Sequence, residues 1–297
     1  MKKRTIIALI VAFALIIGGG MILVFGLSYA GGGEDPVTVL TESEHRIPEA
    51  FDSILIDTED CHVSFVLFEG EADAHVVIRE RERTHHSVLV EDGTLKIEMI
   101  DNRRWMDYVG ICWKNMDMTV YLPQKQYESV QITTDTGDIQ IPEAVSANEM
   151  VLRASTGQIL CSGITADSLD CGTSTGGIRV LDSASAVMKL EASTGTVELE
   201  NVTGTEIYLR TSTGKTEIEH LICKTLTCKS STGDVDLEWV KAEEYLQVST
   251  STGNVEIENS ETATVNIETS TGDVQVPAAW ADSEMRIESD TGKIHFE

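Results

Sequence analysis

A short motif of the form Ser-Thr-Gly-x-Ile/Val returns every 19 or 20 residues from residue 137 to the end of the chain. Self-similarity at one fixed period of this length is typical of stacked repeat units rather than of a single globular core. The motif therefore constrains the fold more than any other feature of the sequence. Its glycines are Gly137, Gly157, Gly176, Gly195, Gly214, Gly233, Gly253, Gly272 and Gly292.

Apolar and polar residues alternate on both sides of each motif glycine. Counted from the glycine, positions −7, −5, +2 and +4 are apolar and position −3 is small, whereas +3 and +5 are mostly polar. Alternation with a period of two predicts strands with one buried face. The parity changes at Ser-Thr-Gly, which predicts a turn where glycine adopts a positive φ. One apolar set is Met188, Leu190, Val197 and Leu199.

The constant period favours an all-β fold, a parallel β-solenoid of 19–20-residue coils with two facing sheets. Successive coils would rise by about 4.8 Å, the ordinary spacing of neighbouring strands. One coil buries too few side chains to offset the entropy of ordering its residues, so the coils must be stabilised by stacking. The alternative is a series of antiparallel hairpins in a sandwich, where a strict period would be a coincidence.

The N-terminal residues predict a membrane segment. Residues 5–30 carry no charge and are mostly Ile, Leu, Val, Ala and Gly, and this length suffices to span a bilayer. We expect a cytoplasmic tail over residues 1–4 and a single transmembrane helix, or uncleaved signal anchor, over residues 5–28. Because basic residues precede the apolar run, the positive-inside rule makes the repeat domain extracellular. The alternative is a signal peptide cleaved after Ala30.

The remainder of the chain divides into three segments. Residues 29–48 are a linker that contains three consecutive glycines at positions 31–33. Residues 49–130 are expected to form an N-terminal β cap over the open end of the solenoid, because terminal units of a stacked array must be covered. Residues 131–297 are the β-solenoid repeats.

Local patterns subdivide the predicted cap. The stretch from Phe51 to Phe65 reads as a degenerate repeat, with Cys61 in the place of the motif glycine. The pattern of residues 88–97 predicts a hairpin around a glycine turn, and that of residues 118–123 predicts a strand that ends at proline.

The charge of the chain restricts its partners. There are 49 acidic and 22 basic residues, for a formal net charge of −27. This negative charge argues against nucleic acid as a partner and against direct adhesion to anionic lipid. Outward carboxylates keep strand surfaces soluble and discourage edge pairing. The functional alternative is attraction of cations or of a basic partner.

The cysteines fall mostly at inward positions. Cys161, Cys171 and Cys228 take places that other repeats give to aliphatic residues, and buried cysteine behaves as a small hydrophobe. Cys223 and Cys228 are the local pair for which a disulfide can be considered.

Together, the anchor, the degenerate first repeat, the strand-rich insert and the Asp/Ser-Thr-Gly-Asp-Val/Ile copies resemble the bacterial putative-adhesin family of β-strand-repeat proteins. That family is a domain of unknown function related to the toast-rack domains of envelope-stress membrane proteins. The resemblance covers roughly residues 45–297. It implies a bacterial cell-surface protein and supplies no catalytic residues.

The sequence indicates no cofactor or metal site. Cys61 and the histidines of the cap lack the spacing of a ligand set. A recurrent aspartate at position +1 could suggest a calcium ladder, but other residues interrupt it too often, which favours solvated turn residues. The histidines are His62, His75, His85 and His86, and the aspartates are Asp138, Asp234 and Asp273.

Two classes of function remain. The first is a non-enzymatic surface module for binding or adhesion, or for sensing envelope state with a membrane partner. The alternative is a wall-glycan-processing β-helix enzyme. No Ser/His/Asp or Cys/His arrangement is visible, and no long loop interrupts the coils between Gly137 and Gly292. We therefore predict that the protein is not an enzyme.

The candidate contact site is a basic and aromatic cluster in the predicted cap. Aromatic residues and arginine are the types most enriched at binding hot spots. The cluster would either pack over the first coil or contact an envelope protein or a wall polymer. Its members are Arg103, Arg104, Trp105, Tyr108 and Trp113.

Overall fold

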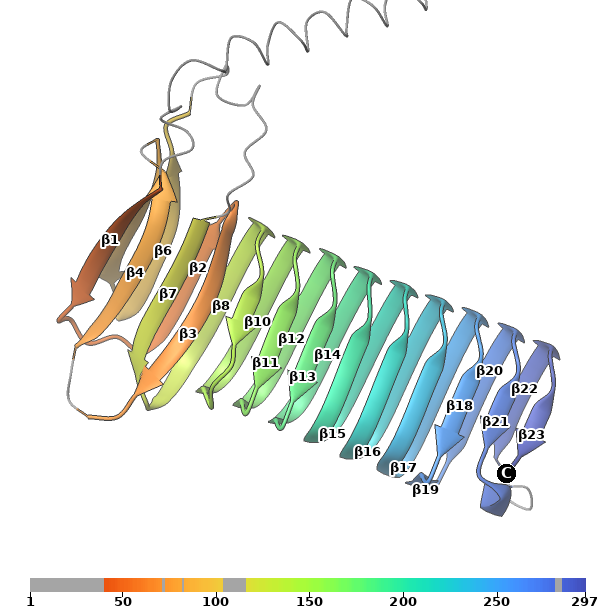
Figure 1. Cartoon of the computed structure of the whole chain (residues 1–297). Coiled ribbons are helices and arrows are strands. Elements are labelled where there is room, and N and C mark those ends of the chain that lie inside the picture. Colours follow the sequence, from red (N-terminus) through yellow and green to blue (C-terminus); the bar gives the residue numbers. More distant parts are fainter. Residues whose placement is uncertain (1–39, 71–72, 82, 104–115, 281–284) are drawn as a thin grey trace, which may run out of the picture.

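The computed structural model describes residues 40–70, 73–81, 83–103, 116–280 and 285–297. These residues form an elongated parallel β-solenoid, in which coils of two strands and two turns stack along one axis (Figure 1). The predicted solenoid is confirmed, because equivalent strands of successive repeats pair in parallel. Met150 lies beside Leu169, and Leu169 lies beside Met188. The repeats do not form antiparallel hairpins.

The strands of the repeats form two facing sheets. Each coil has two corners: the Ser-Thr-Gly turn and a second one near position +6, which we call the looser corner. In three coils the strands on either side of the looser corner are continuous, and they form β15 (Val197–Thr213), β16 (Thr216–Thr232) and β17 (Val235–Thr252). The other strands that precede the motif are β8 (Gln126–Thr136), β10 (Ser146–Thr156), β12 (Thr165–Thr175), β14 (Ala184–Thr194), β20 (Val265–Thr271) and β22 (Arg286–Thr291). Those that follow it are β9 (Ile139–Ile141), β11 (Ile159–Ser162), β13 (Ile178–Leu181), β18 (Val255–Glu258), β21 (Val274–Val276) and β23 (Ile294–Phe296). The short β19 (Glu261–Thr262) and the 3-10 turn η2 (Ala278–Trp280) complete the C-terminal coils.

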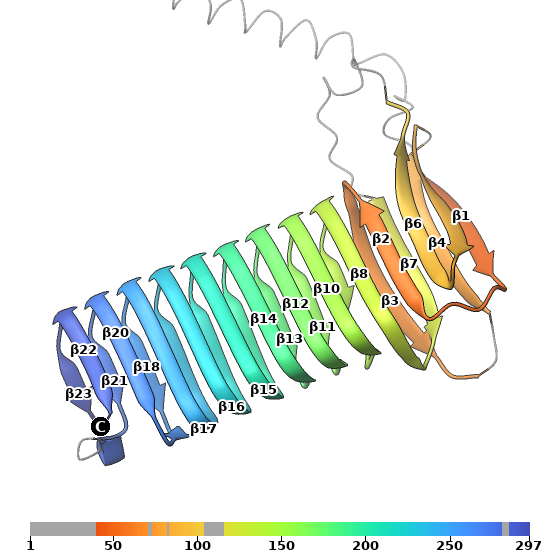
Figure 2. The ribbon, with the colours of Figure 1, turned by 180° about the vertical axis from the view of Figure 1, so that it is seen from behind.

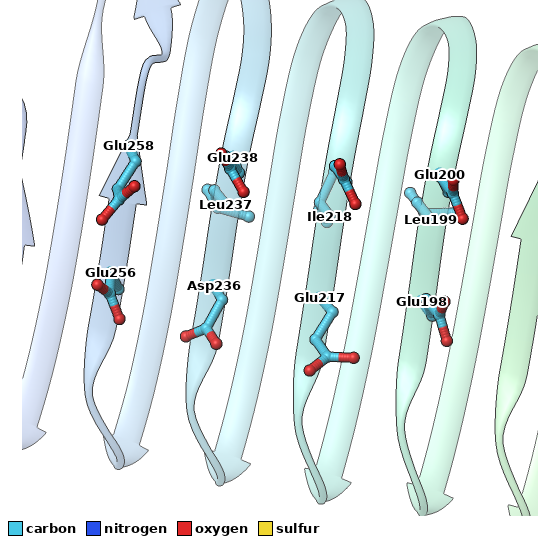
Figure 3. A pocket seen from close by; sticks show the side chains of 11 residues that line it. Glu198, Leu199, Glu200, Glu217, Ile218, Asp236, Leu237, Glu238, Glu256 and Glu258 are labelled. Atoms are coloured by element: carbon cyan, nitrogen blue, oxygen red, sulfur yellow. The ribbon is translucent and has the colours of Figure 1, made fainter.

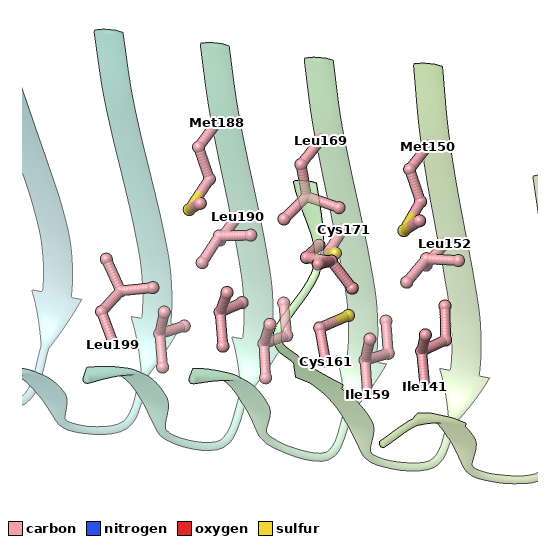
Figure 4. Close-up of a cluster of buried hydrophobic side chains, with 14 of the residues drawn as sticks. Ile141, Met150, Leu152, Ile159, Cys161, Leu169, Cys171, Met188, Leu190 and Leu199 are labelled. Carbon is pink, nitrogen blue, oxygen red and sulfur yellow. The ribbon is translucent and has the colours of Figure 1, made fainter. Parts of the chain in front are cut away.

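The core is a continuous column of apolar side chains between the two sheets. Met150 and Leu152 of β10 point inward from one sheet and Ile159 and Cys161 of β11 from the other, and all four are buried. The same four positions repeat in the next coils (Figure 4). The predicted parity is therefore correct, and each coil contributes one layer to a shared core.

The motif glycine lies where successive coils approach most closely. Gly214 has a φ of +148°, and a Cβ atom built on it would lie 2.0 Å from the carbonyl oxygen of Gly195 on the preceding coil. The predicted positive φ is confirmed. The close backbone approach is a second reason for glycine, which the sequence pattern did not reveal.

The small residue at position −3 is part of the same turn. Thr173 and Thr269 each donate a hydroxyl hydrogen bond to the carbonyl of the motif glycine one coil earlier, at 3.1 and 3.2 Å. Ser289 does the same at 2.9 Å. These inward hydroxyls are therefore paired although they are buried or half-buried.

The aspartates at position +1 hold neighbouring coils together. The Asp234 carboxylate accepts a hydrogen bond from the backbone N–H of Asn254 at 2.8 Å, and the Asn254 side chain accepts one from Asp273 N–H at 2.9 Å. Asp273 accepts from Lys293 N–H and Asp138 from Gln158 N–H, both at 2.8 Å. These residues are therefore structural acceptors, not merely solvated turn residues.

The looser corner has a left-handed residue at position +6. Asp182, Asn201 and Asn259 have φ values of 48°, 55° and 48° there, and asparagine and aspartate tolerate this conformation better than most residues. His220 and Trp239 adopt a φ of 55° in the two coils between Asn201 and Asn259.

The degenerate repeat is a true coil of the solenoid. It consists of β2 (Ser53–Thr58), which lies parallel to β8, and β3 (Cys61–Phe68), which lies parallel to β9. A Cβ on Gly137 would meet the carbonyl oxygen of Cys61 at 2.1 Å. Cys61 therefore takes the place of the motif glycine, as the sequence predicted.

One further coil stacks on the degenerate repeat out of chain order. It is made by β6 (Thr94–Asp101), which lies parallel to β2, and β7 (Met116–Pro123), which lies parallel to β3. Although β7 contains the predicted strand, its place in a coil was not predicted.

Antiparallel strands close this end of the rod. β5 (Thr84–Glu91) pairs with β6, and β4 (Ala74–Arg81) pairs with β7 and with β1 (Leu40–Ile47). The predicted hairpin is the β5–β6 pair, with Asp92 and Gly93 at positive φ in its turn. β1, β4 and β6 gather at one end of the rod, and the C-terminus lies at the other (Figure 2).

In the described part of the chain, no helix has the length and apolar character needed to cross a membrane. The segment predicted to do so, residues 5–28, lies outside the described residues. All five cysteines that the structure describes are buried and have free thiols, including Cys223 and Cys228. Burial raises the pKa of the Cys223 thiol to about 12.

Candidate functional site

A dense array of carboxylates lies on the outer face of the sheet that follows the motif. It lies on four adjacent coils, on β15, β16, β17 and β18, at positions +3 and +5 (Figure 3). These positions alternate with the buried apolar ones, so the pleat directs every carboxylate outward. We call this array the acidic face. Its members are Glu198, Glu200, Glu217, Glu219, Asp236, Glu238, Glu256 and Glu258.

Two cations partly neutralise the acidic face. The Lys215 ammonium lies 2.6 Å from both Glu217 and Asp236 and so bridges two coils. Its hydrogen bonds to Asp236 and Glu217 raise the pKa of Lys215 above its usual value. Arg179, from the preceding coil, lies 2.7 Å from Glu198.

One carboxylate of the acidic face, Glu256, has a raised proton affinity. The pKa of Glu256 is raised, first by partial burial and then by the negative charges of Asp236 and Glu258. Strands in adjacent coils lie about 4.8 Å apart, so like charges repeat at short spacing. Because eight carboxylates share two cations, the face retains a local excess of negative charge.

The shape of this face suits an extended partner. The hollow above it has a volume of about 430 Å³ and is open to solvent, and its walls are the carboxylate side chains themselves. Leu199, Ile218 and Leu237, which alternate with the carboxylates along the strands and are buried, also border the hollow. A surface of this kind can attract basic groups.

Only one member of the predicted contact cluster lies within the described residues. Arg103 pairs with Asp101 at 2.9 Å and with Glu59 at 2.5 Å, and its side chain is 14% exposed. It therefore ties the end of β6 to the turn of the degenerate coil. Arg104, Trp105, Tyr108 and Trp113 lie outside the described residues.

The histidines near Cys61 have separate structural environments. His62 Nδ1 accepts a hydrogen bond from the backbone N–H of Asp138 at 2.9 Å, and His75 stacks on Tyr121 with ring centroids 4.2 Å apart. His86 lies between Glu80 and Thr58. Across the described residues, no three His, Cys, Asp or Glu side chains are arranged to hold a metal ion.

Sequence reasoning did not identify the acidic face as a site. The outward carboxylates were interpreted first as a source of solubility, and attraction of cations or of a basic partner was the functional alternative, without assignment to particular coils. The available signal was positional: both positions are acidic in four successive repeats, whereas earlier repeats have Leu160 and Arg179 at +3. Trp239 was also missed, although it interrupts a column of Asp and Asn residues.

Comparison with known proteins supports the fold and the family. The Toastrack DUF4097 family matches residues 51–219 and 205–297. None of the curated proteins matches the chain in sequence.

Solved structures share the architecture at low sequence identity. A putative adhesin from Parabacteroides distasonis has a TM-score of 0.56 and 14% identity, covering 87% of this chain and 97% of its own. A putative adhesin from Parabacteroides merdae has a TM-score of 0.54 and 14% identity, covering 86% and 95%. A putative lipid binding protein from Parabacteroides distasonis has a TM-score of 0.51 and 15% identity, covering 86% and 97%. At these identities the likeness shows the fold alone.

Proposed function

We propose a binding function for this chain, which belongs to the Toastrack DUF4097 family: it is a surface-displayed β-repeat module that contacts a basic partner without catalysing a reaction. The observation that carries the proposal is the acidic face, where eight carboxylates on four coils share Lys215 and Arg179. Complementary charge steers association and selects partners. The partner is an envelope protein or a wall polymer that bears positive charge.

The regular coils support a binding function rather than an enzymatic one. From β8 to β21 each coil is closed by short turns, and all the described cysteines are buried. The alternative, a wall-glycan-processing enzyme, would need an acid and a base of separated pKa around a substrate pocket. Turnover of a wall glycan by the purified protein would refute the non-enzymatic proposal.

Membrane anchoring is part of the proposal and rests on the sequence. Residues 5–28 would span the membrane once, with residues 1–4 in the cytoplasm and the β cap and solenoid outside. A cysteine introduced at Gly32, in a background without the native cysteines, should react with an impermeant thiol reagent on intact cells. Protection of that cysteine until lysis would contradict this orientation, and release of the protein into the medium would favour cleavage after Ala30.

The binding proposal is tested with two triple variants of equal charge change. In the first, Glu217→Gln, Asp236→Asn and Glu256→Gln remove three of the eight carboxylates of the acidic face. In the control, Glu149→Gln, Glu206→Gln and Glu244→Gln remove three exposed carboxylates elsewhere.

The full-length proteins are displayed on cells, cross-linked to the envelope and purified, and the recovery of each partner is quantified. Recovery should fall roughly tenfold or more for the first variant and change little for the control, because each lost charge contact contributes up to about 1 kcal/mol. Equal partner recovery with both variants would show that the partner does not contact the acidic face.

The aromatic cluster of the cap is a second candidate contact. It is proposed from the sequence, because Trp105, Tyr108 and Trp113 are residue types that dominate binding hot spots. Changing all three to Ala in the full-length protein, with folding confirmed by circular dichroism, should lower partner recovery. Unchanged recovery would leave the acidic face as the contact.

A further inference from the structure

An exposed pair of aromatic rings borders the acidic face at the looser corner of the solenoid. His220 of β16 and Trp239 of β17 occupy position +6 of adjacent coils, and their rings are nearly parallel, with centroids 6.1 Å apart and an interplanar angle of 9°. Trp239 is 50% exposed. A large aromatic surface is therefore presented to solvent beside a row of carboxylates.

The fold does not require a tryptophan at this position. In four other coils the same left-handed corner is formed by Gly163, Asp182, Asn201 and Asn259, which are residues that tolerate positive φ. Trp239 adopts the same φ of 55° although a bulky residue is disfavoured there. The aromatic residue thus departs from the local backbone preference without filling the core.

Carboxylates of the acidic face orient both rings. The indole N–H of Trp239 donates a hydrogen bond to Glu238 Oε1 at 3.0 Å. In the preceding coil, His220 Nδ1 lies 3.4 Å from Glu219 Oε1. Each aromatic residue is therefore held by the carboxylate immediately before it, which leaves the outer face of the indole ring free of these contacts.

Trp239 forms one wall of a hollow that opens toward the C-terminal coils. The hollow has a volume of about 560 Å³, which is within the range of small-ligand sites. Asn259, which is smaller than Trp239, occupies the equivalent corner of the next coil and leaves this space. Of the residues the structure describes, no Lys or Arg lines the hollow, whereas three carboxylates do: those of Glu258, Glu261 and Glu297.

We propose that this hollow binds an arginine side chain of a basic peptide, with the guanidinium group stacked on Trp239 and paired with Glu258. The inference rests on the proposed function and specifies the partner group that the acidic face would recognise. Tryptophan is the best aromatic partner for a cation. Arginine suits the site better than lysine, because its planar guanidinium stacks on a ring and also hydrogen-bonds a carboxylate through two N–H groups.

The test measures the binding of defined peptides to the full-length protein in detergent by isothermal titration calorimetry. The probes are a capped hexa-arginine, a capped hexa-lysine and a capped hexa-citrulline, whose side chains have the shape of arginine without its charge. A neutral hexasaccharide of N-acetylglucosamine tests the competing possibility that the ring stacks on a sugar.

The informative variant is Trp239→Asn, which introduces the residue found at the same corner in two other coils, at Asn201 and Asn259, and should therefore fold normally. Its control is Val187→Ser, which removes a similarly exposed apolar side chain from another coil. We expect Trp239→Asn to weaken hexa-arginine binding about 3- to 30-fold and to abolish the preference for arginine over lysine. Val187→Ser and wild type should bind alike, and hexa-citrulline should not bind.

The remaining outcomes separate this inference from the proposed function. If Trp239→Asn binds hexa-arginine as tightly as wild type while the acidic-face triple variant binds it weakly, the arginine site is wrong and the proposed function stands. Binding of the hexasaccharide in place of hexa-arginine would overturn the inference in favour of a glycan. If wild type binds neither cationic peptide, both proposals fail.

Discussion

The carbonyl oxygen of Gly195 lies 2.0 Å from the place that a Cβ atom on Gly214 would occupy. The same contact recurs between the motif glycines of successive coils, so one backbone approach explains why the motif returns with a constant period. The glycine is required by the stacking of two coils, in addition to the conformation of one turn.

Gly214→Ala should lower the free energy of unfolding by about 2–4 kcal/mol, because the methyl group meets a backbone atom of the preceding coil and the residue has a positive φ. Gly93→Ala is the matched control, since a Cβ there has no atom within 4 Å and only the conformational penalty of about 1 kcal/mol applies. Urea denaturation of both variants measures the difference. Equal losses would mean that the turn, and not the stacking, selects glycine.

The ladder of side-chain acceptors at position +1 gives a second prediction. Asp234→Ala removes the acceptor for Asn254 N–H and should cost about 0.5–1.5 kcal/mol, whereas Asp234→Asn retains an acceptor oxygen and should cost less. Asp167→Ala, at an exposed position of β12, is the control. Thermal unfolding would contradict the structural role if all three variants had the same midpoint as wild type.

The inward parity of the strands predicts a large difference between neighbouring substitutions on β15. Leu209 is 1% exposed, so Leu209→Asp buries an unpaired carboxylate and should cost several kcal/mol. Glu206→Gln changes an exposed residue of the same strand and should stay within about 0.5 kcal/mol. Denaturant titrations of the two variants provide the comparison, and similar midpoints would refute the core assignment.

Much of the fold could be predicted because the repeat encodes it many times. Each copy carries the same alternation and the same glycine, so errors in reading one copy are corrected by the others. The coil made by β6 and β7 could not be predicted, because its two strands lack the motif and are separated by residues 102–115. Its position out of chain order depends on long-range pairing with β2 and β3, which local patterns do not specify.

The candidate site was less predictable than the fold. A carboxylate at +3 or +5 has the same local appearance whether it only solvates a strand or belongs to a binding surface. The acidic face becomes visible when the coils are stacked, since Glu217 and Asp236 then share one lysine across two coils. Trp239 becomes a candidate contact residue in a similar way, because comparison of the coils shows that asparagine occupies the same corner in others.

The environment of His86 leads to a prediction of pH dependence. His86, on β5, hydrogen-bonds Thr58 Oγ1 through Nε2 at 2.9 Å and Glu80 Oε2 through Nδ1 at 3.1 Å, and its side chain is fully buried. Burial lowers the pKa of His86, and the hydrogen bond and negative charge of Glu80 oppose this only in part. Asp60 also favours the charged form, and His85 disfavours it.

The sign of the effect follows from proton linkage. The unfolded chain has a histidine pKa of about 6.5, and the folded chain has a lower one. As the pH falls below about 6.5, the unfolded state takes up a proton that the folded state does not, so the contribution of His86 to stability is present above this pH and is lost below it. The midpoint of thermal unfolding should therefore decrease between pH 7.5 and pH 5.5.

His86→Gln should be less stable than wild type at pH 7.5, and its unfolding midpoint should decrease less over the same pH range. His220→Asn, at an exposed position, serves as the control. An equal decrease in wild type and His86→Gln would show that other groups cause the pH dependence.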